Sequence, residues 1–277
     1  MKKKIILGTA NFSGNYGIFN KQLKKKIDIK KILKFFHKNK LRKIDFSPHY
    51  FNLKNKEKFF KNFQIIYKIT LKKNFTISQI DNEMEISKKF IRKNKIYCLM
   101  FHNTEVIRDK KRIVNLVYYI KKTFKIKKIG ISVYNPAEVN KIMKFFKPDI
   151  IQFPINVFDQ SFLKKNFLSK LSGQNIELHA RSIFLQGLLL QKNYPPFMHK
   201  ELKNHWNFWN NWLLEKNLSP LDACVSFISN IKQLNGIIIG IETLKQLNFI
   251  LNSKKKKLNF NKLAINKKKI INPQNWL

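Results

Sequence analysis

Cysteines and long apolar runs are both scarce in this sequence of 277 residues. The only cysteines, Cys98 and Cys224, lie far apart, and each is flanked by apolar residues. This pattern argues against a disulfide framework or a zinc site, so we expect two buried thiols and no metal centre. No run approaches the roughly 18 apolar residues of a membrane helix. The apolar stretch after Met1 ends at Gly8, too short for a signal-peptide core of roughly 7–15 residues. We therefore expect a cytoplasmic protein without a membrane partner.

Acidic residues are also few: 16 Asp and Glu stand against 56 Lys and Arg, for a net charge of +40. Such a charge is typical of proteins that bind nucleic acid or an anionic surface. Only five of the basic residues are arginine, whereas specific base and phosphate recognition relies on the planar guanidinium. The chain is also rich in Asn, Ile and Phe, whose codons, like those of Lys, are made largely of A and T. We interpret the charge as the result of an AT-rich genome, in which surface positions have drifted to lysine. We therefore expect no specific nucleic-acid partner.

Short apolar strands alternate with helical stretches along most of the chain. Three of the predicted helices begin at capping residues, Asp28, Asn135 and Ser219. The alternation favours a parallel sheet, and eight such units in about 250 residues favour a (β/α)8 TIM barrel, with an open doubly wound sheet as the alternative. The predicted strands are 4–7, 41–46, 63–70, 96–101, 127–134, 148–153, 176–179 and 236–240, and further helices are expected near 53–60, 77–93, 106–122, 160–171 and 243–251.

Two segments stand apart from this alternation. Residues 187–216 are rich in tryptophan, and we expect an irregular, partly helical insertion there that shapes the mouth of a pocket. The lysine-rich residues 253–277 are expected to form a loosely attached tail. We therefore predict one barrel domain over residues 1–252, followed by a basic C-terminal tail.

Four polar residues lie at or just after the ends of three consecutive predicted strands: Asp45 and Tyr50, Lys68, and His102. In a barrel of this type, catalytic residues gather at the C-terminal ends of the strands. Each residue alone has a plainer explanation. Asp45 is also suited to cap a helix or turn, Lys68 is one of many lysines, and His102 has the alternative of a structural histidine.

Together, these residues suit proton transfer to a carbonyl oxygen. A tyrosine has an unperturbed pKa of about 10, too high for efficient proton transfer at neutral pH. An ammonium beside Tyr50 would lower this pKa, and a buried Asp45 would hold Lys68 in place and charged. His102 would orient the carbonyl oxygen or assist the proton transfer. The four residues predict a carbonyl-reducing site that needs a source of hydride.

From about Ile5 to Ile250 the chain resembles the aldo/keto reductase family. The resemblance is carried, in order, by LGTANFSGNYGI, IDFSPHY, KIT, MFHN, KKIGISVYNPAEV, DIIQFPINVFDQ, HARSIFLQGLLL and GIIIGIETLKQL. It implies a barrel that binds NADPH in an extended form without a Rossmann domain. It also implies that the enzyme reduces an aldehyde or ketone to an alcohol, with Tyr50 as the general acid.

The resemblance further implies a cofactor site. Ser132 and Gln152 would bind the nicotinamide amide, and Arg181 stands where many members carry an aromatic that stacks on the ring. From the residues alone, Ser132 has the alternative of simply ending a strand, and Gln152 that of bonding the backbone. The implied cofactor-binding set comprises Thr9, Ala10, Asp45, Ser132, Gln152, Arg181, Ser182, Phe184, Gly240 and Gln246.

The sequence departs from the family pattern at several positions. Phe46 stands where Thr is usual, and Val133 replaces a common Asn. At the adenine end, Glu242 would repel a 2′-phosphate if it points inward, although the family favours NADPH over NADH. These departures leave a second interpretation of the function open: a catalytically impaired nucleotide-binding barrel that acts as an interaction protein. The FLQGLLL segment resembles reductases of bacterial cell-surface sugar pathways, which implies a sugar-type carbonyl substrate; a monomer and a homodimer both remain open.

Overall fold

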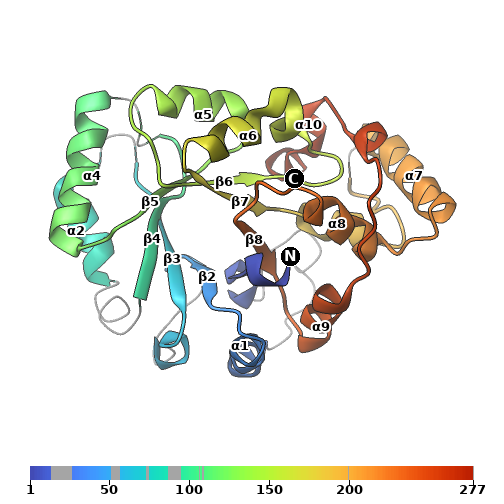
Figure 1. Ribbon diagram of the computed structural model, residues 1–277, viewed down its shortest axis with the longest axis horizontal. Helices are drawn as coiled ribbons and strands as arrows, with labels where there is room; N and C mark the ends of the chain where they lie inside the picture. The colour runs from blue at the N-terminus through green and yellow to red at the C-terminus, as the bar shows by residue number, and fades with distance from the viewer. Residues whose placement is uncertain are drawn as a thin grey trace.

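The computed structural model describes residues 1–13, 27–50, 57–72, 75–86, 95–105, 107, 109–198 and 200–276. Eight parallel strands form a closed barrel in the order of the sequence (Figure 1). The barrel closes where β8 pairs with β1, with Ile237 beside Ile5. The predicted (β/α)8 barrel is therefore confirmed, and the open sheet is excluded. The strands are β1 (Ile5–Gly8), β2 (Lys43–Phe46), β3 (Gln64–Ile69), β4 (Lys95–Phe101), β5 (Ile129–Ser132), β6 (Ile150–Pro154), β7 (Glu177–Arg181) and β8 (Gly236–Gly240).

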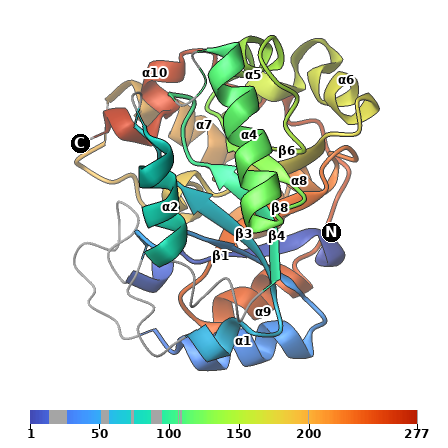
Figure 2. The ribbon, with the colours of Figure 1, turned by 90° about the vertical axis from the view of Figure 1, so that its left-hand side faces the viewer.

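Helices cover the outside of the barrel. Figure 2 shows α2 and α4 over β3 and β4, while α1 and α9 lie side by side because β1 and β8 are neighbours. In the part of the chain that the structure describes, no helix is long and apolar enough to cross a membrane. The helices are α1 (Ile29–Lys38), α2 (Ile77–Ile86), α4 (Lys110–Phe124), α5 (Pro136–Met143), α6 (Phe167–Gly173), α7 (Lys200–Glu215), α8 (Pro220–Ser229), α9 (Leu244–Asn252) and α10 (Lys268–Ile271).

The capping residues expected from the sequence begin the helices they were assigned to. Asp28, Asn135 and Ser219 each accept a hydrogen bond from the backbone N–H three residues later. The helix expected near 106–122 instead begins at Lys110, where Asp109 provides the cap. Parts of the helices expected near 53–60 and 77–93 lie outside the described residues.

The insertion expected over residues 187–216 is partly helical, as predicted: residues 191–198 form no helix or strand, and residues 200–215 form α7. Its tryptophans are buried: Trp209 stacks on Trp212 at 5.8 Å between ring centroids, and Trp212 lies 5.3 Å from the ring of Phe260. Trp212 thus packs against the C-terminal segment, and the tryptophans are not among the residues that line the cleft described below. The apolar faces of the two segments cover one another, because neither could remain exposed without cost. Gly187, Leu190 and Gln191 of the same insertion do line that cleft, as expected.

The described residues of the C-terminal segment, 253–276, are not loosely attached, contrary to the expectation. Phe260 and Trp276 are buried, as are four aliphatic residues between them. The backbone N–H of Ile265 donates to the carbonyl of Phe158 at 2.8 Å, and Gln160 Nε2 donates to the carbonyl of Phe260 at 2.8 Å. The apolar residues spaced among the lysines anchor this segment to the barrel. Cys98 and Cys224 are buried free thiols, as expected.

Candidate active site

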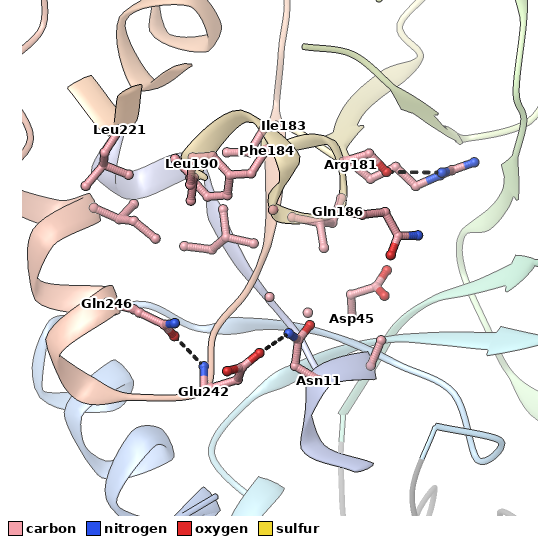
Figure 3. Close-up of a pocket in the computed structure, with 18 of the residues that line it drawn as sticks. Asn11, Asp45, Arg181, Ile183, Phe184, Gln186, Leu190, Leu221, Glu242 and Gln246 are labelled. Carbon is pink, nitrogen blue, oxygen red and sulfur yellow. Dashed lines mark hydrogen bonds between the residues drawn. The ribbon is translucent and has the colours of Figure 1, made fainter. Parts of the chain in front are cut away.

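A cleft of about 580 Å³ lies at the C-terminal ends of the strands. This volume falls within the roughly 300–1,000 Å³ typical of small-molecule sites. The barrel brings to the cleft residues that are far apart in the sequence, because all parallel strands end at the same rim. Figure 3 shows Asp45 of β2 between Arg181 of β7 on one side and Asn11 on the other, with Glu242 and Gln246 beyond Asn11.

Asp45 lies at the centre of a buried network. Its Oδ1 accepts from Lys68 Nζ at 2.9 Å, and its Oδ2 accepts from Gln152 Nε2 at 2.8 Å. Asp45 and Lys68 are only 2% and 4% exposed. The hydroxyl of Thr9 donates to the backbone carbonyl of Asp45 at 2.9 Å. A buried charge is costly unless it is paired and hydrogen-bonded, and here each oxygen of the carboxylate has a donor.

Tyr50 and His102 complete the four residues predicted to act together, and all four line the cleft. The two rings meet edge to face, with their centroids 6.1 Å apart. Lys68 Nζ lies 6.0 Å from the centroid of the Tyr50 ring. His102 Nδ1 shares a hydrogen bond of 3.3 Å with Thr70 Oγ1. The structure thus brings together in one cleft the four residues that the strand ends predicted.

The pKa of Tyr50 is shifted in the direction opposite to the one expected from the sequence. Burial raises the pKa of Tyr50 above its ordinary value, and the carboxylate of Asp45 raises it further, whereas Arg181 opposes the change. The lowering expected from Lys68 does not prevail, because desolvation of the phenolate dominates and Asp45 neutralises the ammonium. Burial, aided by the charge of Lys68, lowers the pKa of His102 to about 4. At neutral pH, Tyr50 therefore carries a proton and His102 is uncharged.

Eight of the ten residues predicted to bind a cofactor line the cleft: Ala10, Asp45, Gln152, Arg181, Ser182, Phe184, Gly240 and Gln246. Thr9 and Ser132 are not among the residues that line it. Thr9 is fully buried, and its hydroxyl donates to the backbone carbonyl of Asp45, so it holds the end of β2 in place instead of facing the cleft. Ser132 is 2% exposed at the end of β5, paired with Gln152 in the strand register.

Gln152 provides a specific acceptor for a cofactor amide. Its Nε2 is committed to Asp45, because a carboxylate accepts and does not donate. Its Oε1 is buried and has no hydrogen-bond partner. A buried acceptor without a partner is unusual in a folded protein. A carboxamide N–H entering the cleft would satisfy it, which fits the predicted nicotinamide site.

Arg181 also faces the cleft, at the end of β7. Its Nη2 donates to the carbonyl of Val133 at 3.2 Å, and its guanidinium lies 4.6 Å from the centroid of the Tyr134 ring. The buried Nε of Arg181 has no hydrogen-bond partner. A planar cation in this place suits a phosphate or a π-system equally.

The sequence reasoning missed several lining residues. Asn11 lies within the first family-like segment but received no role, and Tyr134 and Gln186 were also passed over. Phe249 also received no role. It is 54% exposed and lines the cleft. Both properties depend on the folded structure, so the sequence offered no signal for this residue.

A sequence profile of the Aldo/keto reductase family matches residues 4–271. The chain belongs to the aldo/keto reductase family. Membership makes it an oxidoreductase whose reaction class is carbonyl reduction, and enzymes of the family use nicotinamide cofactors. A search of curated proteins finds no match.

Solved structures share the fold of this aldo/keto reductase. The glycerol dehydrogenase of Gluconobacter oxydans aligns with a TM-score of 0.67 and 17% identity, covering 92% of this chain and 88% of its own. A Pseudomonas aeruginosa protein described as an aldo-keto reductase aligns with a TM-score of 0.60 and 12% identity, covering 90% of this chain and 88% of its own. At these identities the likeness concerns the barrel alone.

Proposed function

We propose that the protein is an NAD(P)H-dependent reductase that converts an aldehyde or ketone to an alcohol. The observation that carries this proposal is the meeting of Tyr50, His102 and the paired Asp45 and Lys68 in one cleft. The buried, unpartnered Oε1 of Gln152 in the same cleft supports a nicotinamide amide as the second reactant.

Tyr50 acts as the general acid. When bound, the cofactor supplies a hydride to the carbonyl carbon. The Tyr50 hydroxyl gives its proton to the carbonyl oxygen. Its raised pKa keeps it protonated beforehand, and the alkoxide that forms as the hydride arrives is a stronger base than a phenolate, so it takes the proton. Arg181, which opposes the rise in the pKa of Tyr50, is the cation that stabilises the resulting phenolate. Asp45 keeps Lys68 charged, and neutral His102 presents an uncharged ring to the carbonyl oxygen.

The rest of the cleft would hold the cofactor. Gln152 would accept from the nicotinamide amide, and Arg181 with Ser182 would lie against the nicotinamide and the pyrophosphate. Beyond Gly240, the β8–α9 turn would receive the adenosine end. The substrate is a small carbonyl compound, for which the FLQGLLL segment favours a sugar-type molecule. We place the enzyme in the cytoplasm, with no specific nucleic-acid partner.

Replacement of Tyr50 by Phe tests the mechanism. Turnover of a panel of aldehydes, ketones and sugar-type carbonyls would be followed by the absorbance of the reduced nicotinamide. Loss of the proton donor is expected to reduce kcat by about 10²–10⁴-fold, while dinucleotide binding stays within a few fold. The control is Tyr118→Phe, at a tyrosine 65% exposed on α4. Unchanged turnover in Tyr50→Phe would reject the mechanism, and binding without turnover by the native protein would favour the impaired nucleotide-binding barrel.

A further inference from the structure

We infer that Glu242 makes this cleft select NADH, the cofactor without a 2′-phosphate, over NADPH. The inference rests on the proposed function, since it concerns the dinucleotide that the same cleft would bind. It runs against the NADPH preference expected from the family. Three features support the inference: the carboxylate of Glu242, its hydrogen-bond partner Asn11, and the first turn of α9.

Glu242 lies where the adenosine end of an extended dinucleotide would lie. It follows β8 by two residues, immediately before Thr243, the capping residue of α9. Its half-buried side chain lines the cleft together with Gln246 and Phe249. Figure 3 shows Glu242 directed toward Asn11, on the side of Asp45 away from Arg181. The inward orientation that the sequence left open is therefore observed.

Asn11 holds the carboxylate in this position. Its Nδ2 donates to Glu242 Oε1 at 3.0 Å. The Asn11 side chain lies against Gly240, where an added Cβ would collide with Asn11 Oδ1. The absence of a side chain at position 240 therefore allows Asn11 to reach Glu242. A carboxylate so fixed offers acceptor oxygens at the cleft wall.

The carboxylate oxygens can accept hydrogen bonds from hydroxyl groups, and their negative charge repels a phosphate. In other dinucleotide sites, an acidic side chain binds the ribose 2′-hydroxyl of NAD, whereas an arginine accommodates the 2′-phosphate of NADP. A phosphate monoester carries a charge of about −1.5 to −2 at neutral pH. Placed beside Glu242, it would be repelled in a half-buried setting where screening is weak.

The first turn of α9 offers little compensation to a phosphate. A helix N-terminus can bind an anion through its free N–H groups. Here Gln246 Oε1 accepts from the N–H groups of Glu242 and Thr243, at 2.7 and 3.2 Å, and Thr243 Oγ1 accepts from the N–H of Gln246. This capping box therefore occupies three of the N–H groups at the start of α9 internally.

Two cations of the cleft lie away from Glu242. Among the lining residues that the structure describes, the charged bases are Lys68 and Arg181. Lys245, on the first turn of α9, does not line the cleft; its exposed ammonium lies over the ring of Phe249, 5.6 Å from the centroid. Lys68 is paired with Asp45, and Figure 3 places Arg181 on the side of the cleft opposite Glu242. They are positioned for the reacting carbonyl and the pyrophosphate rather than for a 2′-phosphate.

Isothermal titration calorimetry of the purified full chain with NADH and with NADPH tests the inference. We expect a Kd for NADH at least about tenfold lower than for NADPH. In Glu242→Gln, which keeps the shape and removes the charge, NADPH should tighten by about tenfold, while NADH changes little. Raising the salt concentration should narrow the preference in the native protein more than in the variant. Glu215→Gln, at an exposed glutamate on α7, is the matched control and should keep the native ratio.

The outcomes separate this inference from the proposed function. Equal or tighter binding of NADPH by the native protein would overturn the NADH selection and leave the reductase intact. A preference for NADH that survives Glu242→Gln unchanged would overturn the role of Glu242. Failure of both dinucleotides to bind would reject the proposed function itself, and the inference with it.

Discussion

Gln152 on β6 donates a hydrogen bond of 2.8 Å across the barrel to Asp45 on β2. The two residues are 107 positions apart in the sequence. The bond satisfies Asp45 Oδ2 and at the same time fixes which end of the Gln152 amide is left for a ligand. One buried contact thus links the proton-transfer group to the predicted nicotinamide site.

Replacing Gln152 by Leu should affect both sides of this link. The lost donor leaves Asp45 Oδ2 without a partner, which should lower the free energy of unfolding by about 1–3 kcal/mol. Dinucleotide binding should weaken as well, because Oε1 is lost. Urea denaturation and calorimetric titration measure the two effects, with Gln174→Leu, at an exposed glutamine, as the control. Undiminished dinucleotide affinity would remove Gln152 from the cofactor site.

Lys68→Met should be more destabilising than most single substitutions. It leaves the buried carboxylate of Asp45 without its cation, which typically costs about 3–5 kcal/mol. The double variant Asp45→Asn with Lys68→Met should recover part of that loss, because no charge remains unpaired. Thermal and urea unfolding of the two single variants and the double variant give the coupling energy. Strictly additive losses would show that the pair does not interact as the 2.9 Å contact implies.

His102 should make stability depend on pH. Its pKa is lowered from 6.5 to about 4, so between these values the unfolded chain binds a proton that the folded chain does not. Stability should therefore rise as the pH increases from about 4 to 6.5, and the contribution is lost as the pH falls through this window. Comparing His102→Asn with the native protein in urea at several pH values isolates the effect. The variant should show a shallower slope in this window, and parallel curves would contradict the assignment.

Glu177 should matter for stability and not for catalysis. It begins β7, at the end of the barrel opposite the cleft, and its carboxylate contacts Lys128, Tyr97 and His179. These partners hold the pKa of Glu177 below its usual range against the effect of burial. Its stabilising effect is therefore present above the unfolded pKa of about 4.3 and is lost as the pH falls further.

Glu177→Gln should lower the free energy of unfolding by about 1–3 kcal/mol at neutral pH. Affinity for the dinucleotide should not change, because residues at this end of a barrel support stability. Urea denaturation and calorimetry on one preparation test both points. A large change in dinucleotide affinity without a change in stability would contradict this division.

Phe260→Ala tests the anchoring of the C-terminal segment. The ring of Phe260 packs against Trp212 and Phe227, at 5.3 and 5.4 Å between centroids. Its truncation should cost about 3–5 kcal/mol, measured as a lower Tm and urea midpoint. Lys255→Gln, at an exposed lysine of the same segment, should change stability by no more than about 0.5 kcal/mol. Equal effects of the two variants would mean that the segment is not anchored through Phe260.

The local pattern of the sequence was sufficient to predict the strands and the capping residues of α1, α5 and α8. Apolar runs of strand length and capping side chains act within a few residues, so their physical cause lies in the sequence itself. The same is true of the positions of Asp45, Lys68 and His102 relative to strand ends. The pattern failed for the C-terminal segment, because its apolar residues are buried only through contacts with α7 and the barrel, which are distant in the sequence.

The sequence by itself determined the alternation of eight strands with helices and the position of four polar residues at strand ends, because period and spacing are local properties. Tertiary structure decided that the sheet closes into a barrel, since β8 pairs with β1. Tertiary structure alone decided which atom of Gln152 remains available and that burial outweighs Lys68 in setting the pKa of Tyr50. It also decided that Asn11 turns Glu242 toward the cleft. Each of these features depends either on desolvation or on a contact between residues far apart in the sequence. Neither cause can be evaluated before the barrel closes.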